Sequence, residues 1–423
     1  MPLRWETPKV FYGWWIVVAS FLIATYAGGV AFYGFTAFFE PIANETGWSY
    51  TQISLAASIR GLEMSLLSPL VGILADRWGP KRLVFSGVFV MVAGLLLLGT
   101  AQSLTMFYLA FALLALGAST CSVTVLMTAV TNWFRSKMGL ASGIAICGFG
   151  FSGLLIPVAV NLITVYDWRM AVNILALGML FLLLPLSLFL RHHPEQYGYF
   201  PDGRKPNAAA SLDELGAKQV NEAEIRVKPA LKSGALWRLA LSRMYQMMVV
   251  GAVSTHIMPY LSSIGISRSR SSLVAMLIPL ISVFGRLGFG LLGDKFNKRL
   301  VASASFVLIG AGALCLAYIS LTNIWLIVLF LVLMGTGYGG TNGILPPLGR
   351  EYFGRTHFGS IYGLMEGIGT IGGIIGPAIA GWAYDNWNSY YTVWLWLAGL
   401  MVVPVISVFT ITPIENTDTK NQS

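Results

Sequence analysis

The sequence predicts an all-α membrane protein with twelve transmembrane helices in two six-helix, pseudo-symmetric bundles. The first observation is composition: 56% of the 423 residues are hydrophobic and 11% are charged, against about 25% charged in soluble globular proteins. The second is that many apolar runs reach the roughly 20 residues needed to cross a bilayer. The third is a charged turn at residues 72–82 that is repeated at residues 290–299. Internal repeats in membrane proteins are typical of secondary transporters.

Twelve spans are predicted between charged or Pro/Gly-rich breaks. Backbone polar groups in lipid need internal partners, so each span is expected to be helical. Trp48, Trp168 and Trp325 lie near span ends, as interfacial aromatic residues do. The predicted spans are 12–39, 50–74, 82–102, 105–133, 138–164, 168–190, 237–263, 271–293, 300–321, 324–348, 358–384 and 389–412.

Positive charge orients these spans. With a cytoplasmic N-terminus, 21 Lys and Arg residues fall inside and three fall outside. The positive-inside rule therefore predicts a multi-pass protein of the plasma (cytoplasmic) membrane with both termini cytoplasmic. The expected parts are an N-terminal bundle (1–190), a cytoplasmic linker (191–236), a C-terminal bundle (237–413) and a cytoplasmic tail (414–423).

Several functional classes are excluded by the same residues. The net charge of +9 comes from short turns and forms no basic stripe, so no nucleic-acid partner is expected. Cys121, Cys147 and Cys315 lie in apolar runs without metal spacing. We expect no metal, no cofactor and no enzymatic activity, because no nucleophile–base constellation is visible. The Gly-rich segments at 148–153 and 335–340 lie inside spans and indicate close helix packing.

A second repeat joins spans four and five at residues 132–143 and spans ten and eleven at residues 351–363. The turn at 72–82, with the pattern G-x-L-x-D-R-x-G-x-[KR]-R, resembles the signature loop of the major facilitator superfamily. Within it, the chain is similar to bacterial members of the monocarboxylate and oxalate transporter branch. The residues that carry this similarity are Tyr12-Gly13-Trp14-Trp15, Asn132-Trp133-Phe134, Arg286, His193-Pro194-Glu195-Gln196-Tyr197-Gly198 and Pro201-Asp202-Gly203.

Arg286 is the leading candidate for substrate binding. It lies eight residues from Asp294, or roughly 12 Å along a helix, near the middle of a roughly 30 Å hydrocarbon core. A guanidinium is permanently charged and matches the geometry of a carboxylate. The resemblance implies that an arginine at this place binds the substrate carboxylate. The alternative is a structural ion pair with an acid on another helix.

The chain departs from the family near this arginine. Animal monocarboxylate transporters have a lysine where this chain has Tyr33, and an aspartate where it has Ser282. Oxalate-type relatives have a second cation in span eleven, where this chain has Gly369. One buried arginine without a second cation favours a monoanion. Tyr33, Tyr338 and Asn342 are candidates for neutral hydrogen bonds to it, or are packing residues.

Four further ionisable residues stand out within predicted spans, where a charge is costly. Glu366 lies at a depth similar to Arg286 and is a candidate for proton coupling, or else forms a permanent pair with Arg286. Arg60 and Glu63 are three residues apart and can form a structural pair on one helix face, an outer gate or a proton relay. His256 is either a pH-sensing residue or simply hydrogen-bonded.

The two signature turns are candidates for a cytoplasmic latch, because rocking bundles need contacts with two discrete arrangements. Topology signals are the alternative for the basic members. The candidate gating residues are Asp76, Arg77, Arg82, Asp294, Lys295 and Arg299.

The resulting prediction is a secondary active transporter of a small organic monocarboxylate, lactate- or pyruvate-like, coupled to protons and working by alternating access as a monomer. Its expected partners are the organic anion, the proton and the lipid bilayer. The alternatives are an exporter or anion exchanger of the same fold for another small metabolite or drug and, outside transport, a sensor or scaffold that does not transport.

Overall fold

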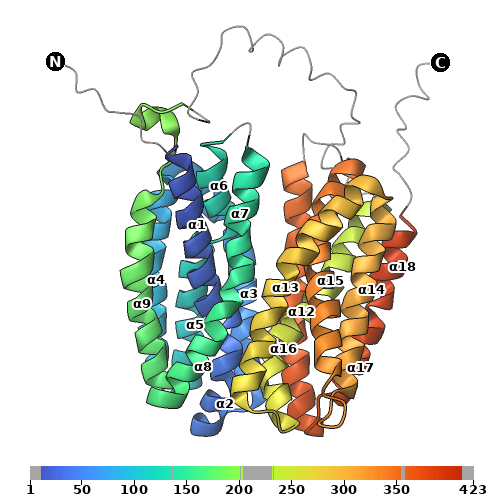
Figure 1. The fold of residues 1–423 in the computed structure, drawn as a ribbon. Helices are drawn as coiled ribbons and strands as arrows, with labels where there is room; N and C mark the ends of the chain where they lie inside the picture. Colours follow the sequence, from blue (N-terminus) through green and yellow to red (C-terminus); the bar gives the residue numbers. More distant parts are fainter. Residues whose placement is uncertain are drawn as a thin grey trace, which may run out of the picture.

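The computed structural model describes residues 11–134, 137–200, 202, 231, 233–353 and 358–411, and within them all regular structure is helical. Figure 1 shows two bundles side by side, with α1 beginning and α18 ending on the same side of the molecule. Most of the predicted linker and all of the predicted tail at 414–423 lie outside the described residues.

The first bundle contains the helices before residue 190. They are α1 (Gly13–Gly28), η1 (Gly29–Tyr33), α2 (Phe35–Thr46), α3 (Tyr50–Trp78), α4 (Pro80–Gly99), α5 (Leu104–Thr120), α6 (Val123–Thr131), α7 (Met138–Phe151), η2 (Ser152–Leu154), α8 (Leu155–Tyr166) and α9 (Trp168–Phe189).

The second bundle follows a short helical turn, η3 (Pro194–Tyr197). Its helices are α12 (Gly234–Ser263), α13 (Arg268–Lys295), α14 (Lys298–Tyr318), α15 (Leu326–Phe353), α16 (Phe358–Trp387), α17 (Tyr391–Leu400) and α18 (Val402–Phe409).

The membrane-length helices agree with the predicted spans. Among the described residues, ten helical segments are long and apolar enough to cross a membrane. The other two predicted spans are α3 and α12, with 29 and 30 residues, whose polar side chains include Arg60 and His256. Both run alongside the other helices (Figure 1). The predicted fold class is confirmed, and the twelve predicted spans fit the helices observed.

The first membrane-length segment contains a wide helical turn at η1, where the Gly34 N–H donates to the Gly29 carbonyl at 2.7 Å. A Cβ atom on Gly29 would lie 2.7 Å from the Ser152 carbonyl oxygen. The absence of a side chain there lets η1 and η2 approach backbone to backbone. Single π-type turns of this kind are frequent at functional sites, and this one positions Tyr33.

This first segment is also longer than predicted, because α2 continues to Thr46 rather than ending near residue 39. Glu40 is the first charged residue after the predicted end of this span. In the structure its carboxylate instead faces the second bundle, where Ser262 Oγ donates to it at 3.0 Å and Arg268 Nε lies 3.9 Å away. A polar side chain near a span end therefore continues the helix when a partner helix supplies bonding groups.

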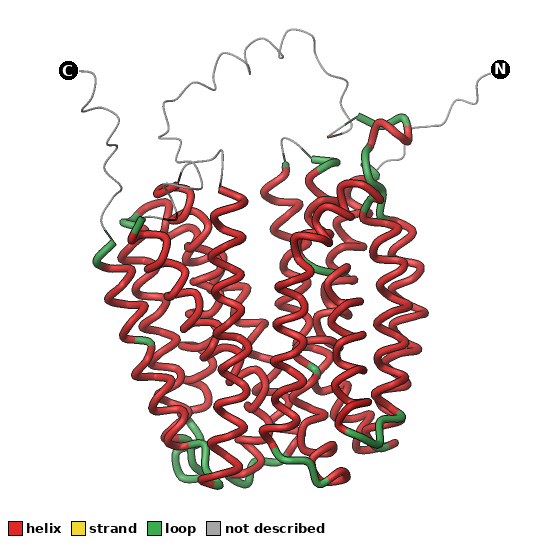
Figure 2. The backbone as a smooth tube through the Cα atoms, turned by 180° about the vertical axis from the view of Figure 1, so that it is seen from behind, coloured by secondary structure: helices red, strands yellow, loops and turns green. Residues whose placement is uncertain are grey.

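The two bundles meet most closely at the end where α2 joins α3 and α12 joins α13, which we call the contact end. Figure 2 shows the ribbons approaching there and diverging toward the opposite, terminal end, where α1 begins. Hydrogen bonds between the bundles at the contact end include Ser54 to His256 at 3.0 Å and Arg268 Nη2 to the Ala37 carbonyl at 2.7 Å.

The start of the predicted linker packs on the first bundle at the terminal end. The Arg191 guanidinium lies over the rings of Tyr12 and Tyr197, 3.8 and 4.4 Å from their centroids. Trp133 Nε1 donates to the Arg191 carbonyl at 3.3 Å. Residues around η3 therefore form an ordered cap on this bundle.

Candidate functional site

Three residues predicted to bind substrate meet between the bundles. Tyr33 belongs to η1 of the first bundle, and its hydroxyl oxygen lies 3.3 Å from that of Tyr338 on α15. Asn342 lies one turn further along α15 and donates through Nδ2 to the Tyr338 carbonyl at 3.0 Å. All three side chains are half-buried. The structure thus brings both bundles to one cluster of neutral hydrogen-bonding groups.

Arg286 lies beside this cluster because α13 and α15 touch backbone to backbone. A Cβ on Gly339 would lie 2.7 Å from the backbone nitrogen of Arg286, and a Cβ on Gly343 would lie 2.5 Å from the backbone carbonyl oxygen of Arg286. The half-buried Arg286 guanidinium interacts electrostatically with Tyr33 and Cys147 of the first bundle, so it faces the other bundle rather than lipid.

Arg286 has no acidic partner within ion-pair distance among the described residues, and its buried Nε atom has no hydrogen-bond partner there. Within the described residues, Arg286 therefore does not form the structural ion pair that was the alternative interpretation. A guanidinium without a counter-ion, placed between two bundles, is suited to bind an anion.

A second buried arginine, Arg243 on α12, was missed by the sequence analysis. Its Nη2 donates to Glu366 Oε2 on α16 at 2.9 Å. Its Nη1 donates to Gln246 Oε1 at 2.7 Å and to Asn342 Oδ1 at 3.0 Å. Asn342 therefore links Arg243 to α15, one turn from Tyr338.

Two sequence-based expectations are corrected by this arrangement. Glu366 pairs with Arg243 and not with Arg286. The expectation of one buried arginine without a second cation is also wrong, because Arg243 supplies a second one from span seven. Gly369 makes room for it: a Cβ on Gly369 would lie 2.6 Å from Arg243 Cγ.

Similar depth brings these charged groups together. Arg243 is nine residues from Gly234, Arg286 is nine from Lys295, and Glu366 is eight from Phe358, each counted from the terminal end of its helix. At 1.5 Å per residue these separations are about 12–14 Å. Tyr362, one turn from Glu366 on α16, interacts electrostatically with both arginines. The second bundle thus presents two cations and one carboxylate at one level.

Arg60 and Glu63 do not form the expected pair. The buried Arg60 guanidinium donates to the Ala31 carbonyl in η1 and lies 5.1 Å from the Phe32 ring centroid. The wide turn of η1 presents this carbonyl to α3, and a carbonyl with an aromatic face replaces the acid as partner. Arg60 therefore supports the turn that carries Tyr33.

Arg243, Arg286 and Glu366 are called the arginine cluster below. His256 is fully buried at the contact end and is separate from this cluster. Its Nδ1 lies 3.0 Å from Tyr390 Oη, and its Nε2 lies 3.0 Å from both Ser54 Oγ and the Pro377 carbonyl. Three close partners and contact with the first bundle make it part of the junction between the bundles.

The candidate gating residues lie at the terminal end. The Asp76 side chain lies outside the described part of the structure, while Arg77, Arg82, Asp294 and Lys295 are exposed. Arg299 Nη1 donates to the Ile411 carbonyl of its own bundle at 2.7 Å. Their latch function stays a prediction.

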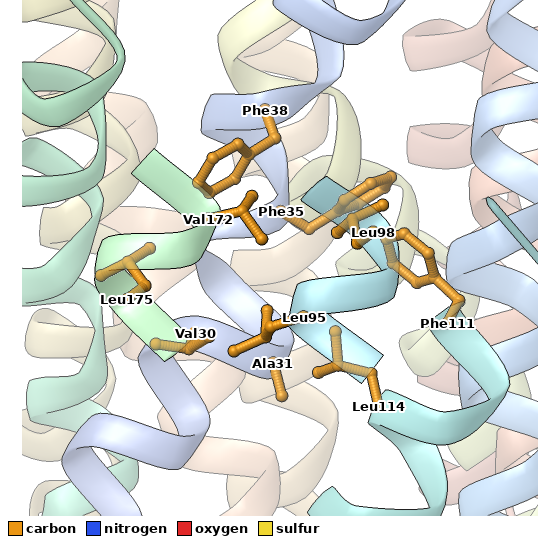
Figure 3. Close-up of a pocket in the computed structure, with 10 residues that line it drawn as sticks. All are labelled: Val30, Ala31, Phe35, Phe38, Leu95, Leu98, Phe111, Leu114, Val172 and Leu175. Carbon is orange, nitrogen blue, oxygen red and sulfur yellow. The ribbon is translucent and has the colours of Figure 1, made fainter. Parts of the chain in front are cut away.

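A small pocket lies apart from this cluster, inside the first bundle (Figure 3). It is lined by apolar side chains from η1, α2, α4, α5 and α9, including Phe35, Phe38 and Phe111. A pocket without a charged or hydrogen-bonding side chain is unsuited to a carboxylate. The arginine cluster is therefore the candidate site.

Two membrane-embedded bundles with charged residues facing their junction define a multi-pass membrane transport protein. The sequence profile of the Major Facilitator Superfamily matches residues 19–366 and, in a second overlapping match, residues 257–423. The chain belongs to the Major Facilitator Superfamily.

Relatives with assigned names extend this result. Monocarboxylate transporter 12 of Xenopus laevis is 24% identical over 98% of this chain and 91% of its own length. The mouse protein of the same name, from Mus musculus, is 26% identical over 94% of this chain and 84% of its own length. Monocarboxylate transporter 13 of Rattus norvegicus is 24% identical over 92% and 86%. The resemblance to the monocarboxylate transporter branch is confirmed.

Solved structures show the same fold. An inward-facing, occupied structure of a bacterial homologue of the human lysosomal transporter Spinster superposes with a TM-score of 0.71 at 16% identity, covering 95% of this chain and 96% of that one. The unoccupied inward-facing structure gives a TM-score of 0.68 at 17% identity, covering 95% of both chains.

Proposed function

We propose that this protein is a secondary active transporter of a small organic monocarboxylate, lactate- or pyruvate-like, coupled to protons and working by alternating access as a monomer. Arg286 binds the substrate carboxylate, and Tyr33, Tyr338 and Asn342 supply hydrogen bonds. We further propose that the protein lies in the plasma membrane with both termini cytoplasmic, with residues 1–190 and 237–413 as its two moving domains.

The observation that carries this proposal is the uncompensated charge of Arg286 at the junction of the bundles. Its Nε atom is buried without a partner among the described residues. A permanent cation in that position costs free energy until an anion binds it. A bound monocarboxylate neutralises this charge and reaches the Tyr33 and Tyr338 hydroxyls on opposite bundles.

The arrangement of the bundles supports the transport cycle. Hydrogen bonds join the bundles at the contact end. The positive-inside rule places the terminal end in the cytoplasm, so the contact end faces the outside of the cell. On α16, added Cβ atoms on Gly363 and Gly367 would meet nothing within 4 Å. We infer an inward-facing state in which the site opens toward the terminal end, and Asp76 with Asp294 help to close that end in the opposite state.

The test is uptake of labelled lactate and pyruvate into proteoliposomes that contain wild-type protein or Arg286→Lys. Lysine keeps the charge and loses the forked geometry, so uptake is expected to fall to background. Arg238→Lys is the matched control, because Arg238 is an exposed arginine that binds the Thr410 carbonyl at 2.7 Å. Normal uptake by Arg286→Lys at normal expression contradicts the proposal.

The same vesicles separate the mechanisms. Uptake driven by an inwardly directed proton gradient supports symport. Uptake that requires unlabelled carboxylate inside the vesicles supports anion exchange and removes proton coupling from the proposal.

A further inference from the structure

We propose that Arg243 is a second cation able to bind a ligand carboxylate. The Glu366 carboxylate takes the place of that ligand until Glu366 is protonated. This inference rests on the proposed function and extends its substrate class to short dicarboxylates in the protonated state. A proton that binds the Glu366 carboxylate breaks its ion pair with Arg243, and the freed guanidinium then accepts a ligand carboxylate.

The first support is an asymmetry within the pair. Six per cent of the Arg243 side chain is exposed, against 32% of the Glu366 side chain. Arg243 is also held by hydrogen bonds to Gln246 and Asn342. Glu366 is therefore the partner that a proton or a competing anion reaches first.

The second support is the need of Arg243 for a negative partner. Its Nε atom and the Nε2 atom of fully buried Gln246 have no hydrogen-bond partner among the described residues. Removing the Glu366 charge leaves a buried cation uncompensated, which is strongly unfavourable. A ligand carboxylate in the place of Glu366 restores both the charge balance and a charge-assisted hydrogen bond.

The third support is the closeness of the two cations. Tyr362 interacts electrostatically with both Arg243 and Arg286. Asn342, which accepts from Arg243, lies one turn from Tyr338 on α15, and the Tyr338 hydroxyl meets that of Tyr33 beside Arg286. A ligand with two carboxylates on a short carbon chain therefore has a cation for each.

The charge count sets the selectivity. With Glu366 ionised, the two arginines and one carboxylate give a net charge of +1, which a monoanion neutralises. With Glu366 protonated the net charge is +2, which matches a dianion. The binding of a single proton thus adds dianions to the ligands whose charge the site is able to neutralise.

Charged and titratable side chains surround the pair of Arg243 and Glu366. Arg243 from α12 donates to Glu366, and Tyr362 interacts with Glu366 from the same helix. Tyr338 from α15 interacts with Arg243, and Arg286 from α13 interacts with Tyr362. α3 also packs on α16 and carries Arg60, which binds Ala31, and Glu63. Both arginines are permanent cations in proteins, and a tyrosine ordinarily loses its proton only near pH 10.

The test measures ligand-induced thermal shifts of the full-length protein in detergent, with lactate and malonate as probes at about pH 6.5 and about pH 8, where malonate is mainly a dianion. We expect malonate to bind wild type about tenfold more tightly at the lower pH, because one hydrogen bond to a charged group is gained. In Glu366→Gln, malonate is expected to bind tightly at both pH values. Glu351→Gln, which removes an exposed carboxylate paired with Lys298, is the matched control.

A double variant, Arg243→Gln with Glu366→Gln, keeps the inference testable if the single variant unfolds, because it removes both charges. It is expected to lose the malonate shift at both pH values, because the second carboxylate-binding cation is gone. A lactate shift without any malonate shift in wild type at the lower pH overturns this inference alone. The absence of shifts with both carboxylates overturns the proposed function as well.

Discussion

The hydroxyl oxygens of Tyr33 and Tyr338 lie 3.3 Å apart and connect the two bundles beside Arg286. Tyr33 is carried by the wide turn η1 and Tyr338 by a stretch of α15 that packs closely on α13. A phenol both donates and accepts hydrogen bonds. The contact is therefore a place where an anion on Arg286 is able to reach both bundles at once.

Tyr338→Phe removes this hydroxyl and keeps the ring. We expect KM for the carboxylate to rise about 3–10-fold, the loss of about one hydrogen bond, as measured by initial uptake rates in proteoliposomes. The exposed Tyr318, which contacts Tyr391 at an outer surface, supplies the control variant Tyr318→Phe. In a double-mutant cycle, Tyr33→Phe is expected to add little to Tyr338→Phe. An unchanged KM in Tyr338→Phe removes this residue from the site.

Asp385→Asn is expected to loosen the contact end. The Asp385 carboxylate on α16 accepts from the backbone N–H groups of Tyr50 and Thr51 at 2.9 and 2.7 Å, and also from the Thr51 hydroxyl. These donors lie at the N-terminus of α3, where a negative charge is favoured. Loss of that charge shifts the equilibrium toward opening by about tenfold.

Cys147 is a native reporter of this change, because it lies near Arg286 at the junction. With Cys121 and Cys315 replaced by serine, labelling of Cys147 by an impermeant maleimide added at the contact end should rise in Asp385→Asn. Glu45→Gln is the control, since Glu45 pairs with Arg169 at 2.8 Å within one bundle. Equal labelling of both variants speaks against a role for Asp385 in closing this end.

The sequence was sufficient for the fold because membrane spans are set by length and apolar content. The segment formed by α7, η2 and α8 (138–166) and the helix α9 (168–189), for example, begin and end within two residues of the predicted spans 138–164 and 168–190. It was sufficient for Arg286 and Glu366 for a related reason: a charge eight or nine residues into an apolar run is conspicuous, and its depth follows from the helical rise.

The pairing of these charges was not predictable from one sequence. Arg243 lies close to Arg238 and Trp237, near the start of its predicted span, and was not among the residues singled out from the sequence. Its burial depends on Gly369 of a helix more than 100 residues away, which leaves room for its side chain. Arg60 was matched to the nearest acid along its helix, whereas its partner is a carbonyl exposed by the wide turn η1. Contacts between helices decided each case.

Arg60 and Glu63 should therefore behave independently. We expect Glu63→Gln to change stability by the same amount whether residue 60 is Arg or Gln, with a coupling free energy below about 0.5 kcal/mol. The measurement is a double-mutant cycle of thermal unfolding in detergent. A coupling of several kcal/mol, as found when a buried ion pair is broken, means that the two side chains are paired after all.

The pH dependence of uptake should follow Glu366 and not His256. Glu366 is partly exposed beside the two arginines, and protonation breaks its bond to Arg243, so uptake by wild type should rise as the pH on the uptake side falls. Glu366→Gln is permanently neutral and should give uptake that is independent of pH between about 5.5 and 7.5.

His256 is sealed among Ser54, Tyr390 and the Pro377 carbonyl, and a charged imidazole there has no carboxylate within hydrogen-bond distance among the described residues. His256→Gln keeps hydrogen-bonding capacity and should change the rate of uptake without changing the shape of its pH profile. The measurement is initial uptake of labelled lactate against external pH for wild type and both variants. A flat profile in His256→Gln together with a normal profile in Glu366→Gln would move the proton-binding role from the arginine cluster to the contact end.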